Sequence, residues 1–151
     1  MAELRIRNEG DMMAAGAALA PCLRPGDIVA LRGGLGAGKT TLVRGMLRAL
    51  GLEEEAPSPT FAIVQPYAPP DVSLPLAHVD LYRLDMPEEA AELGLDEYLL
   101  DGALVIEWPE RLGAALWPDA LMVDIAVAPD DGIRRLTASV PPSWKDRWPF
   151  P

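Results

Sequence analysis

The chain has 151 residues, half of them hydrophobic, and this length predicts one compact domain without a second independent core. Acidic residues outnumber basic residues by 23 to 13, and the resulting net charge of −10 argues against a broad electrostatic attraction to nucleic acid. The single cysteine, Cys22, excludes an internal disulfide and a thiolate metal cluster, and it predicts a reducing, cytoplasmic location.

The first predicted elements are a short strand around Leu4 and Ile6 and an Ala-rich helix over Asp11–Leu23 that Pro25-Gly26 ends. The apolar run Met12–Leu23, which follows Arg5 and Arg7, superficially resembles a secretion signal. Acids at positions 3, 9 and 11 interrupt the basic leader that such a signal requires. No apolar stretch approaches the length of about 20 residues that crosses a bilayer. We therefore expect the helix to belong to the domain.

A strand, a glycine loop and a helix follow in immediate succession. Asp27–Arg32 is a brief apolar run rich in strand formers, and Thr41–Leu50 has apolar residues at helical spacing. The loop between them contains the phosphate-binding pattern Gly, four residues of any kind, Gly, Lys and Thr over Gly33–Thr40. Such a match also arises by chance as an ordinary glycine turn whose Lys and Thr are solvated, but the flanking strand and helix favour a phosphate site.

The chemistry of this loop is that of an anion cradle. Glycines let several N–H groups turn toward one point, and the helix start adds its dipole. Lys39 is expected to reach the outer phosphates, the Thr40 hydroxyl to bind Mg²⁺, and Thr41 to donate to an inner phosphate. The predicted nucleotide-binding residues are Gly36, Ala37, Gly38, Lys39, Thr40 and Thr41.

The rest of the chain alternates strand-like runs with proline-rich loops at Glu53–Pro59 and Pro69–Pro75. A helix is predicted to open at Pro87 and to run to Gly94. Two late strands, joined by a Pro-Asp-Asp-Gly turn, are expected to form a hairpin. The predicted strands are Phe61–Tyr67, Leu76–Leu84, Ala103–Trp108, Leu121–Val127 and Ile133–Val140.

Together these elements predict an α/β P-loop NTPase fold, with a central, mostly parallel sheet, flanking helices and a C-terminal antiparallel hairpin. Residues 1–140 are expected to form a single P-loop ATPase domain. Residues 141–151 form a tail rich in Pro and Trp that either packs on the surface or is disordered.

Two carboxylates are candidates to complete the site. Asp80 follows the apolar run of one predicted strand, and Glu107 follows that of another, so both are expected at the nucleotide edge of the sheet. The alternative is that each strand simply becomes polar where it leaves the core, and the pattern does not rank the two acids. His78 is the one histidine of the chain, and P-loop hydrolysis does not require histidine, so we leave it out of the catalytic set.

Other residues near these acids have two open interpretations. Arg83 is placed either to counter phosphate charge or to form a surface ion pair with Glu88 or Glu89, and Arg134 and Arg135 carry the same ambiguity. Trp108 follows Glu107 and lies either beside the nucleotide or, as tryptophans more often do, in simple core or interface packing.

Four segments occur in an order and spacing that match one family. They are Leu35–Gly45 (LGAGKTTLVRG), Ser58–Phe61 (SPTF), His78–Leu84 (HVDLYRL) and Ile106–Glu110 (IEWPE). Only the first is shared with unrelated P-loop proteins. Together they resemble the bacterial P-loop ATPase TsaE of tRNA threonylcarbamoyladenosine biosynthesis, and the resemblance extends to about Val140. The chain departs from the family pattern at Gly34, where the family usually has aspartate.

The resemblance implies ATP and Mg²⁺ as cofactors and assigns roles to particular residues. Lys39 and Asp80 are implied to be catalytic, and Thr40 and Glu107 to hold the metal. Ser58-Pro59-Thr60 resembles a switch loop that senses the terminal phosphate.

The resemblance also implies partners and a place of action. The family hydrolyses ATP in an assembly with TsaB and TsaD, which modifies adenosine-37 of tRNA. The chain itself is then expected to meet tRNA only indirectly, in agreement with its acidic charge, and to be a weak ATPase in isolation that its partners stimulate.

Three other functions are compatible with a phosphate loop. A small-molecule P-loop kinase is the first alternative, but it requires an acceptor pocket and a lid, and the sequence has no obvious arginine-bearing lid segment. A GTP-driven switch usually needs an Asn/Thr-Lys-x-Asp segment for guanine, whereas Asn8 is the one asparagine here. A module that binds ATP without turnover, only to fix a partner surface, is the third.

Overall fold

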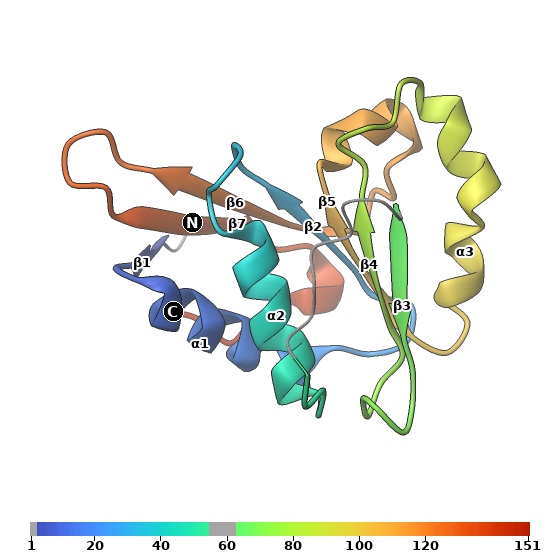
Figure 1. Cartoon of the computed structure of the whole chain (residues 1–151), viewed down its shortest axis with the longest axis horizontal. Helices are drawn as coiled ribbons and strands as arrows, with labels where there is room; N and C mark the ends of the chain where they lie inside the picture. Colours follow the sequence, from blue (N-terminus) through green and yellow to red (C-terminus); the bar gives the residue numbers. More distant parts are fainter. Residues whose placement is uncertain (1–2, 55–62) are drawn as a thin grey trace.

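A seven-stranded mixed sheet is the centre of the computed structural model, which describes residues 3–54 and 63–151 (Figure 1). The strand order is β1-β7-β6-β2-β5-β4-β3, and the central strands β6, β2, β5 and β4 are parallel. The hairpin of β6 and β7 is antiparallel, so the predicted α/β fold with its C-terminal hairpin is confirmed. The strands are β1 Glu3–Ile6, β2 Ile28–Arg32, β3 Val64–Tyr67, β4 Leu76–Asp80, β5 Ala103–Glu107, β6 Leu121–Val127 and β7 Arg134–Ser139.

The sheet separates two hydrophobic cores. One face is covered by α1 (Glu9–Leu19) and α2 (Lys39–Ala49), and the other by short helical turns and α3 (Leu95–Tyr98) (Figure 1). No helix among the described residues is long and apolar enough to cross a membrane. The 3-10 turns are η1 Ala20–Cys22, η2 Pro87–Leu93, η3 Pro109–Ala115 and η4 Pro142–Trp144.

Several predicted elements differ from the structure in extent or type, most of them by one or two residues at an end. The first helix begins at Glu9, two residues early, because the Asn8 side chain accepts a hydrogen bond from the Asp11 amide at 2.8 Å and caps it. The strand expected to reach Leu84 ends at Asp80, where the carboxylate accepts from the Tyr82 amide at 3.0 Å and turns the chain. The helix predicted from Pro87 is a 3-10 helix.

The proline-rich tail packs onto the α1 and α2 side of the sheet. The Trp144 side chain is buried in that core, and the Arg147 guanidinium stacks on its ring at 4.2 Å. Arg147 also donates to both carboxylate oxygens of Asp27, at 2.6 and 3.0 Å, and to the Cys22 carbonyl oxygen at 2.8 Å. This paired geometry holds the tail against the start of β2.

Two glycines let α1 and α2 approach closely, and this contact positions the phosphate loop at the start of α2. A Cβ added to Gly16 would lie 2.1 Å from the Leu42 carbonyl oxygen, and one added to Gly45 would lie 2.2 Å from the Met13 carbonyl oxygen. Each helix therefore presents a glycine to the backbone of the other, and no side chain fits at either position without separating them.

We expect Gly16→Ala to destabilise the fold although alanine is the better helix former. The gain in helix propensity is about 1 kcal/mol. Forcing apart two packed backbones costs more, so the net loss in free energy of unfolding should be about 1–3 kcal/mol. Urea unfolding measures it. Ala17→Leu, which adds more bulk at the next, exposed position of α1, is the control and should change stability little. A Gly16→Ala variant as stable as the wild type would contradict the close packing.

Candidate nucleotide site

The loop after β2 has the backbone of a phosphate cradle. Gly36 and Gly38 adopt positive φ angles of 75° and 112°, and Gly38 caps α2 directly before Lys39. A Cβ at Gly33 would lie 2.8 Å from the Ile125 carbonyl oxygen of β6, which keeps the loop entrance tight. The first-turn amides of α2 have no acceptor within the helix and are available to an anion.

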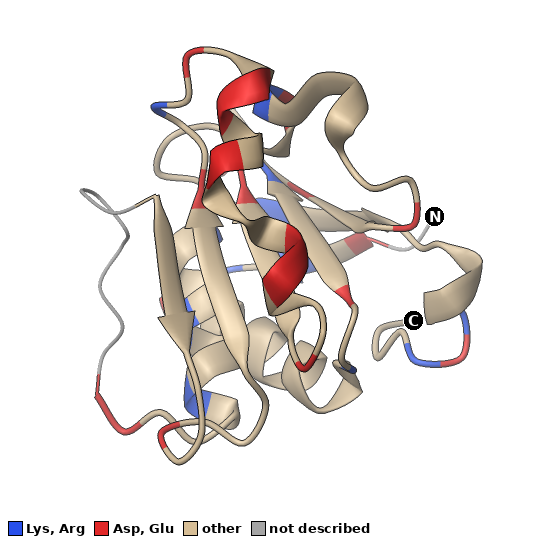
Figure 2. Ribbon diagram, turned by 90° about the vertical axis from the view of Figure 1, so that its right-hand side faces the viewer, with Lys and Arg blue, Asp and Glu red and all other residues tan. Residues whose placement is uncertain are grey.

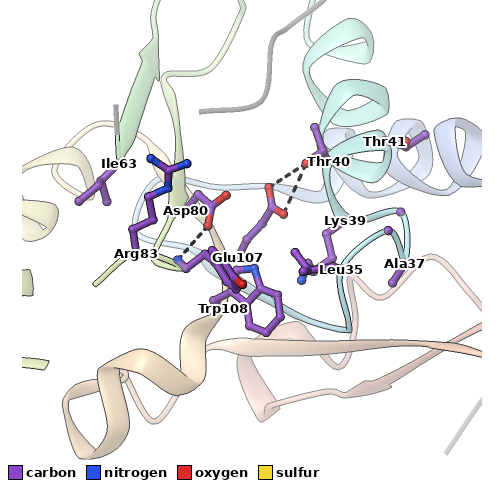
Figure 3. A pocket seen from close by; sticks show the side chains of 13 residues that line it. Leu35, Ala37, Lys39, Thr40, Thr41, Ile63, Asp80, Arg83, Glu107 and Trp108 are labelled. Atoms are coloured by element: carbon purple, nitrogen blue, oxygen red, sulfur yellow. Dashed lines mark hydrogen bonds between the residues drawn. The ribbon is translucent and has the colours of Figure 1, made fainter. Parts of the chain in front are cut away.

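A cavity of about 400 Å³ opens in front of this loop (Figure 3). That volume is within the range of small-molecule sites. Its walls come from the loop and the start of α2, from the ends of β4 and β5, and from Ile63. The lining residues are Leu35, Gly36, Ala37, Gly38, Lys39, Thr40, Thr41, Ile63, Asp80, Tyr82, Arg83, Glu107 and Trp108.

Lys39 lies between the loop and an indole. Its ammonium group donates to the Gly33 carbonyl oxygen at 2.5 Å and lies 3.7 Å from the centroid of the Trp108 ring. Burial lowers the pKa of Lys39, and the carboxylates of Glu107, Asp80 and Glu110 oppose that shift. A phosphate would supply this partly desolvated cation with a direct anionic partner.

Trp108 occupies its position because its backbone is left-handed, with φ 60°. The indole also meets the Tyr82 ring at a centroid distance of 5.0 Å, so the two aromatic side chains form one wall of the cavity. Both interpretations from sequence keep a part: Trp108 lines the cavity, and it also packs against the core on the α3 side of the sheet.

Thr40, Glu107 and His78 form a buried chain of contacts. The Thr40 hydroxyl donates to the Glu107 carboxylate at 3.2 Å, and Nε2 of His78 lies 2.5 Å from the same carboxylate (Figure 3 draws the Thr40 contact). His78 and Glu107 are 1% and 3% exposed. A carboxylate only accepts hydrogen bonds, so Nε2 carries the hydrogen, and Nδ1 of His78 has no partner among the described residues. His78 thus fixes the orientation of Glu107.

Asp80 stands beside Glu107 because β4 and β5 pair in parallel with these two residues in register. Burial raises the pKa of Asp80, the Tyr82 amide that it accepts from opposes the shift, and the Glu107 carboxylate adds to it. The site therefore holds a second carboxylate whose charge is disfavoured by its surroundings.

Arginines take three different positions. Arg134 braces the loop from β7, donating to the carbonyl oxygens of Ala37 at 2.7 Å and Gly36 at 3.0 Å. Arg83 lines the cavity, and no ion pair joins it to Glu88 or Glu89. Arg135 instead lies near surface carboxylates, 3.8 Å from Glu3.

Comparisons with known proteins agree with this geometry. Residues 6–136 match the family model described as threonylcarbamoyl adenosine biosynthesis protein TsaE. The chain belongs to the TsaE family. Two relatives that carry the name tRNA threonylcarbamoyladenosine biosynthesis protein TsaE come from Bacillus subtilis and Streptomyces coelicolor. The Bacillus subtilis protein is 41% identical over a match that covers 72% of this chain and 66% of the relative. The Streptomyces coelicolor protein is 42% identical over a match that covers 82% of this chain and 86% of the relative.

A solved TsaE-like structure has the same fold. The crystal structure of Bacillus subtilis YdiB superposes with a TM-score of 0.75 at 33% sequence identity, covering 96% of this chain and 88% of that one. The match covers nearly the whole chain, so the architecture described above is that of a P-loop NTPase-like TsaE protein.

The TsaE-family fold brings together all of the described residues that the sequence singled out for the site: Gly36, Ala37, Gly38, Lys39, Thr40, Thr41, Asp80 and Glu107. Ser58-Pro59-Thr60, expected to be a switch loop, lies outside the described residues. Sequence reasoning missed the contact of His78 with Glu107 and the bracing role of Arg134. A Cβ added at Gly34 would meet no atom within 4 Å, so the loop backbone leaves space at the position where the family usually has aspartate.

A divalent cation fits this TsaE-family site only together with a polyphosphate. The described residues contain no group of three or more His, Cys, Asp and Glu side chains that would hold a metal by themselves. Thr40 and Glu107 offer oxygen ligands within 3.2 Å of each other, next to the loop. Mg²⁺ prefers oxygens and takes its remaining ligands from phosphate and water, which matches this incomplete set.

Asp80→Asn is expected to stabilise the empty protein. In the wild type the folded state keeps its proton on Asp80 to higher pH than the unfolded state, so this carboxyl lowers stability as pH rises from its unfolded pKa through its folded pKa. Asparagine removes that cost and still accepts from the Tyr82 amide. The melting temperature should rise by about 1–3 °C at neutral pH, and the gain should vanish at about pH 3.

Circular dichroism at the two pH values measures this effect, with exposed Asp101→Asn as the control. A neutral-pH melting temperature of Asp80→Asn at or below that of the wild type would argue against a desolvated carboxylate.

His78→Leu is expected to cost about 3–5 kcal/mol of unfolding free energy at neutral pH, because it leaves the buried Glu107 carboxylate without its imidazole partner. His78→Gln retains an N–H donor and should lose less than half as much. Urea unfolding of the two variants side by side measures the difference. Equal stability of both variants would mean that the imidazole only fills space.

Proposed function

We propose that this chain binds and hydrolyses Mg·ATP as a component of the machinery that makes N6-threonylcarbamoyladenosine at adenosine-37 of tRNA, acting on a complex of TsaB- and TsaD-type proteins. Membership of the TsaE family supports the pathway. The observation that carries the activity is the convergence of a phosphate loop and two strand-end carboxylates on one cavity, with Lys39 and Thr40 facing Asp80 and Glu107 (Figure 3).

Binding is assigned to the loop and to α2. The amides from Gly36 to Thr41 surround the phosphates, and Lys39 exchanges the Gly33 carbonyl oxygen for an outer phosphate oxygen. Thr40 and Glu107 are the residues that would hold Mg²⁺, and His78 keeps the Glu107 carboxylate turned toward Thr40. Bound Mg²⁺ would neutralise charge on the phosphate oxygens.

Hydrolysis is assigned to Asp80. Its carboxylate lines the cavity beside Glu107. One carboxylate oxygen, Oδ1, accepts from the Tyr82 amide, so the second oxygen can orient water toward the terminal phosphate. Raising the pKa of Asp80 makes it a better proton acceptor than an ordinary surface aspartate. Burial of Asp80 thus favours its role as a general base, at some cost in the stability of the folded protein.

Lys39→Ala and Thr40→Ala are expected to lose Mg·ATP turnover by about a hundredfold or more while the domain stays folded, because both side chains face the cavity. Thr40→Ser retains the hydroxyl and is the matched control. Phosphate release and nucleotide affinity are measured with circular dichroism as the check on folding. Wild-type turnover in either alanine variant would refute the assignment.

Reconstitution separates this function from its alternatives. The chain is incubated with TsaB, TsaD, tRNA, ATP and the other substrates, and both modified adenosine and inorganic phosphate are measured with and without it. The expected result is weak phosphate release alone, stimulation by the partners, and modified tRNA only in the complete mixture. A phosphorylated small molecule in place of phosphate would show a kinase, and modification supported by a turnover-dead variant would show a nucleotide-sensing module.

A further inference from the structure

A second cavity lies on the opposite side of the sheet from α1 and α2, between η2, α3 and η3. Its volume is about 520 Å³, and its floor is apolar or small. We call it the acidic groove, and its floor includes Pro87, Ala91, Leu95, Leu112, Ala115 and Trp117. None of these residues lines the nucleotide cavity, so the groove is a separate feature.

Acids dominate the surroundings of the groove. The one basic residue of η2, α3 and η3 is Arg111, whose guanidinium lies 5.9 Å from the centroid of the Tyr82 ring, at the wall of the nucleotide cavity. Residues 84–110 contain nine acids and no lysine or arginine. Eight of the nine are exposed, Glu107 being the exception. Figure 2 shows acidic positions repeated along the helical turns of this face. Glu88 and Asp96 line the groove itself.

Most of these acids make no side-chain hydrogen bond or ion pair with another described residue. Glu89 caps the Met86 amide at 2.9 Å, and Asp96 accepts from the Trp117 indole at 3.2 Å. Glu88, Glu92 and Glu97 take part in no ion pair or side-chain hydrogen bond of the described part of the chain. Like charges held this close raise the energy of the free protein, and a cationic partner would relieve that repulsion.

The groove therefore matches one class of occupant. Its floor accepts aliphatic or aromatic side chains, and its rim accepts Lys and Arg. Nucleic acid and anionic lipid surfaces are repelled by the rim. We propose that the acidic groove docks a basic, amphipathic segment of a partner protein, which inserts apolar side chains between η2 and η3 and pairs its cations with Glu88, Glu92 and Glu97.

The groove is joined to the nucleotide site through short connections. η3 begins at Pro109, directly after Glu107 and Trp108, and η2 follows the turn that Asp80 makes with Tyr82. A partner held here would contact η2 and η3, the helical turns that follow the two strand-end carboxylates in the chain. This proposal rests on the proposed function for the identity of the partner, the TsaB and TsaD pair.

The test is binding of the purified TsaB and TsaD pair, measured by calorimetry. The first variant is Glu88→Lys/Glu92→Lys/Glu97→Lys, and the second, Ala91→Phe, fills the groove without changing charge. The matched control is Glu53→Lys/Glu54→Lys/Asp130→Lys, three exposed acids outside the groove with the same change in net charge. We expect both groove variants to bind at least about tenfold more weakly, the control to bind like the wild type, and wild-type affinity to fall with added salt.

Three results would overturn the proposal. If Ala91→Phe and the triple groove variant both bind the pair with wild-type affinity, the groove is not the docking surface, while the proposed function remains intact. If the control variant loses as much affinity as the triple groove variant, the loss comes from the change in net charge and not from the groove. No binding of the wild-type chain to the pair would refute the partner assignment and the docking proposal together, whereas ATP turnover by the chain alone would still stand. Nucleotide affinity, which the groove residues do not contact, verifies that each variant is folded.

Discussion

The parallel register of β2, β5 and β4 is the constraint on which the site depends. Leu31, Glu107 and Asp80 occupy matched positions on these three strands, so the loop that follows β2 faces both carboxylates. Side chains alternate along a strand, and a slip of one residue would turn either acid to the opposite face. The apolar residues before each acid fix the register by burial, and packing of the core thus determines the placement of the charged groups.

Polar burial in this protein is concentrated at the cavity. Among the described residues the buried polar or charged side chains are Lys39, His78 and Glu107, and the three lie in one contiguous group with Thr40 and Trp108. Burying charge costs free energy unless it is paired. Glu107 is satisfied by Thr40 and His78, whereas Lys39 and Asp80 remain partly desolvated, with pKa values shifted against their charged forms. The cost at Lys39 is one that a phosphate can relieve, because the anion would pair with the partly desolvated ammonium group.

Local patterns predicted most of the fold, because strand alternation, helix spacing and the glycine loop each depend on residues that are close together in the sequence. The loop motif and the strand-end acids likewise predicted that Lys39, Thr40, Asp80 and Glu107 lie at one edge of the sheet, and the structure has all four in one cavity. Their catalytic and metal roles stay predictions. Contacts between distant segments were not predictable. Arg134 braces a loop 97 positions earlier in the chain, and His78 meets Glu107 only because of strand pairing. The sequence of the proline-rich tail did not decide between packing and disorder, because burial of the tail depends on a core formed by other parts of the chain.

The pairing of β1 with β7 has a consequence for how the protein is made. The first strand of the chain has its hydrogen-bonding partner at residues 134–137, and the core beneath it is completed by Trp144. During synthesis β1 therefore stays without its sheet partner until residues 134–137 have left the ribosome, whereas α1 and α2 can pack together much earlier. Until then the backbone edge of β1 is accessible to chaperones, so this side of the sheet is completed late in synthesis.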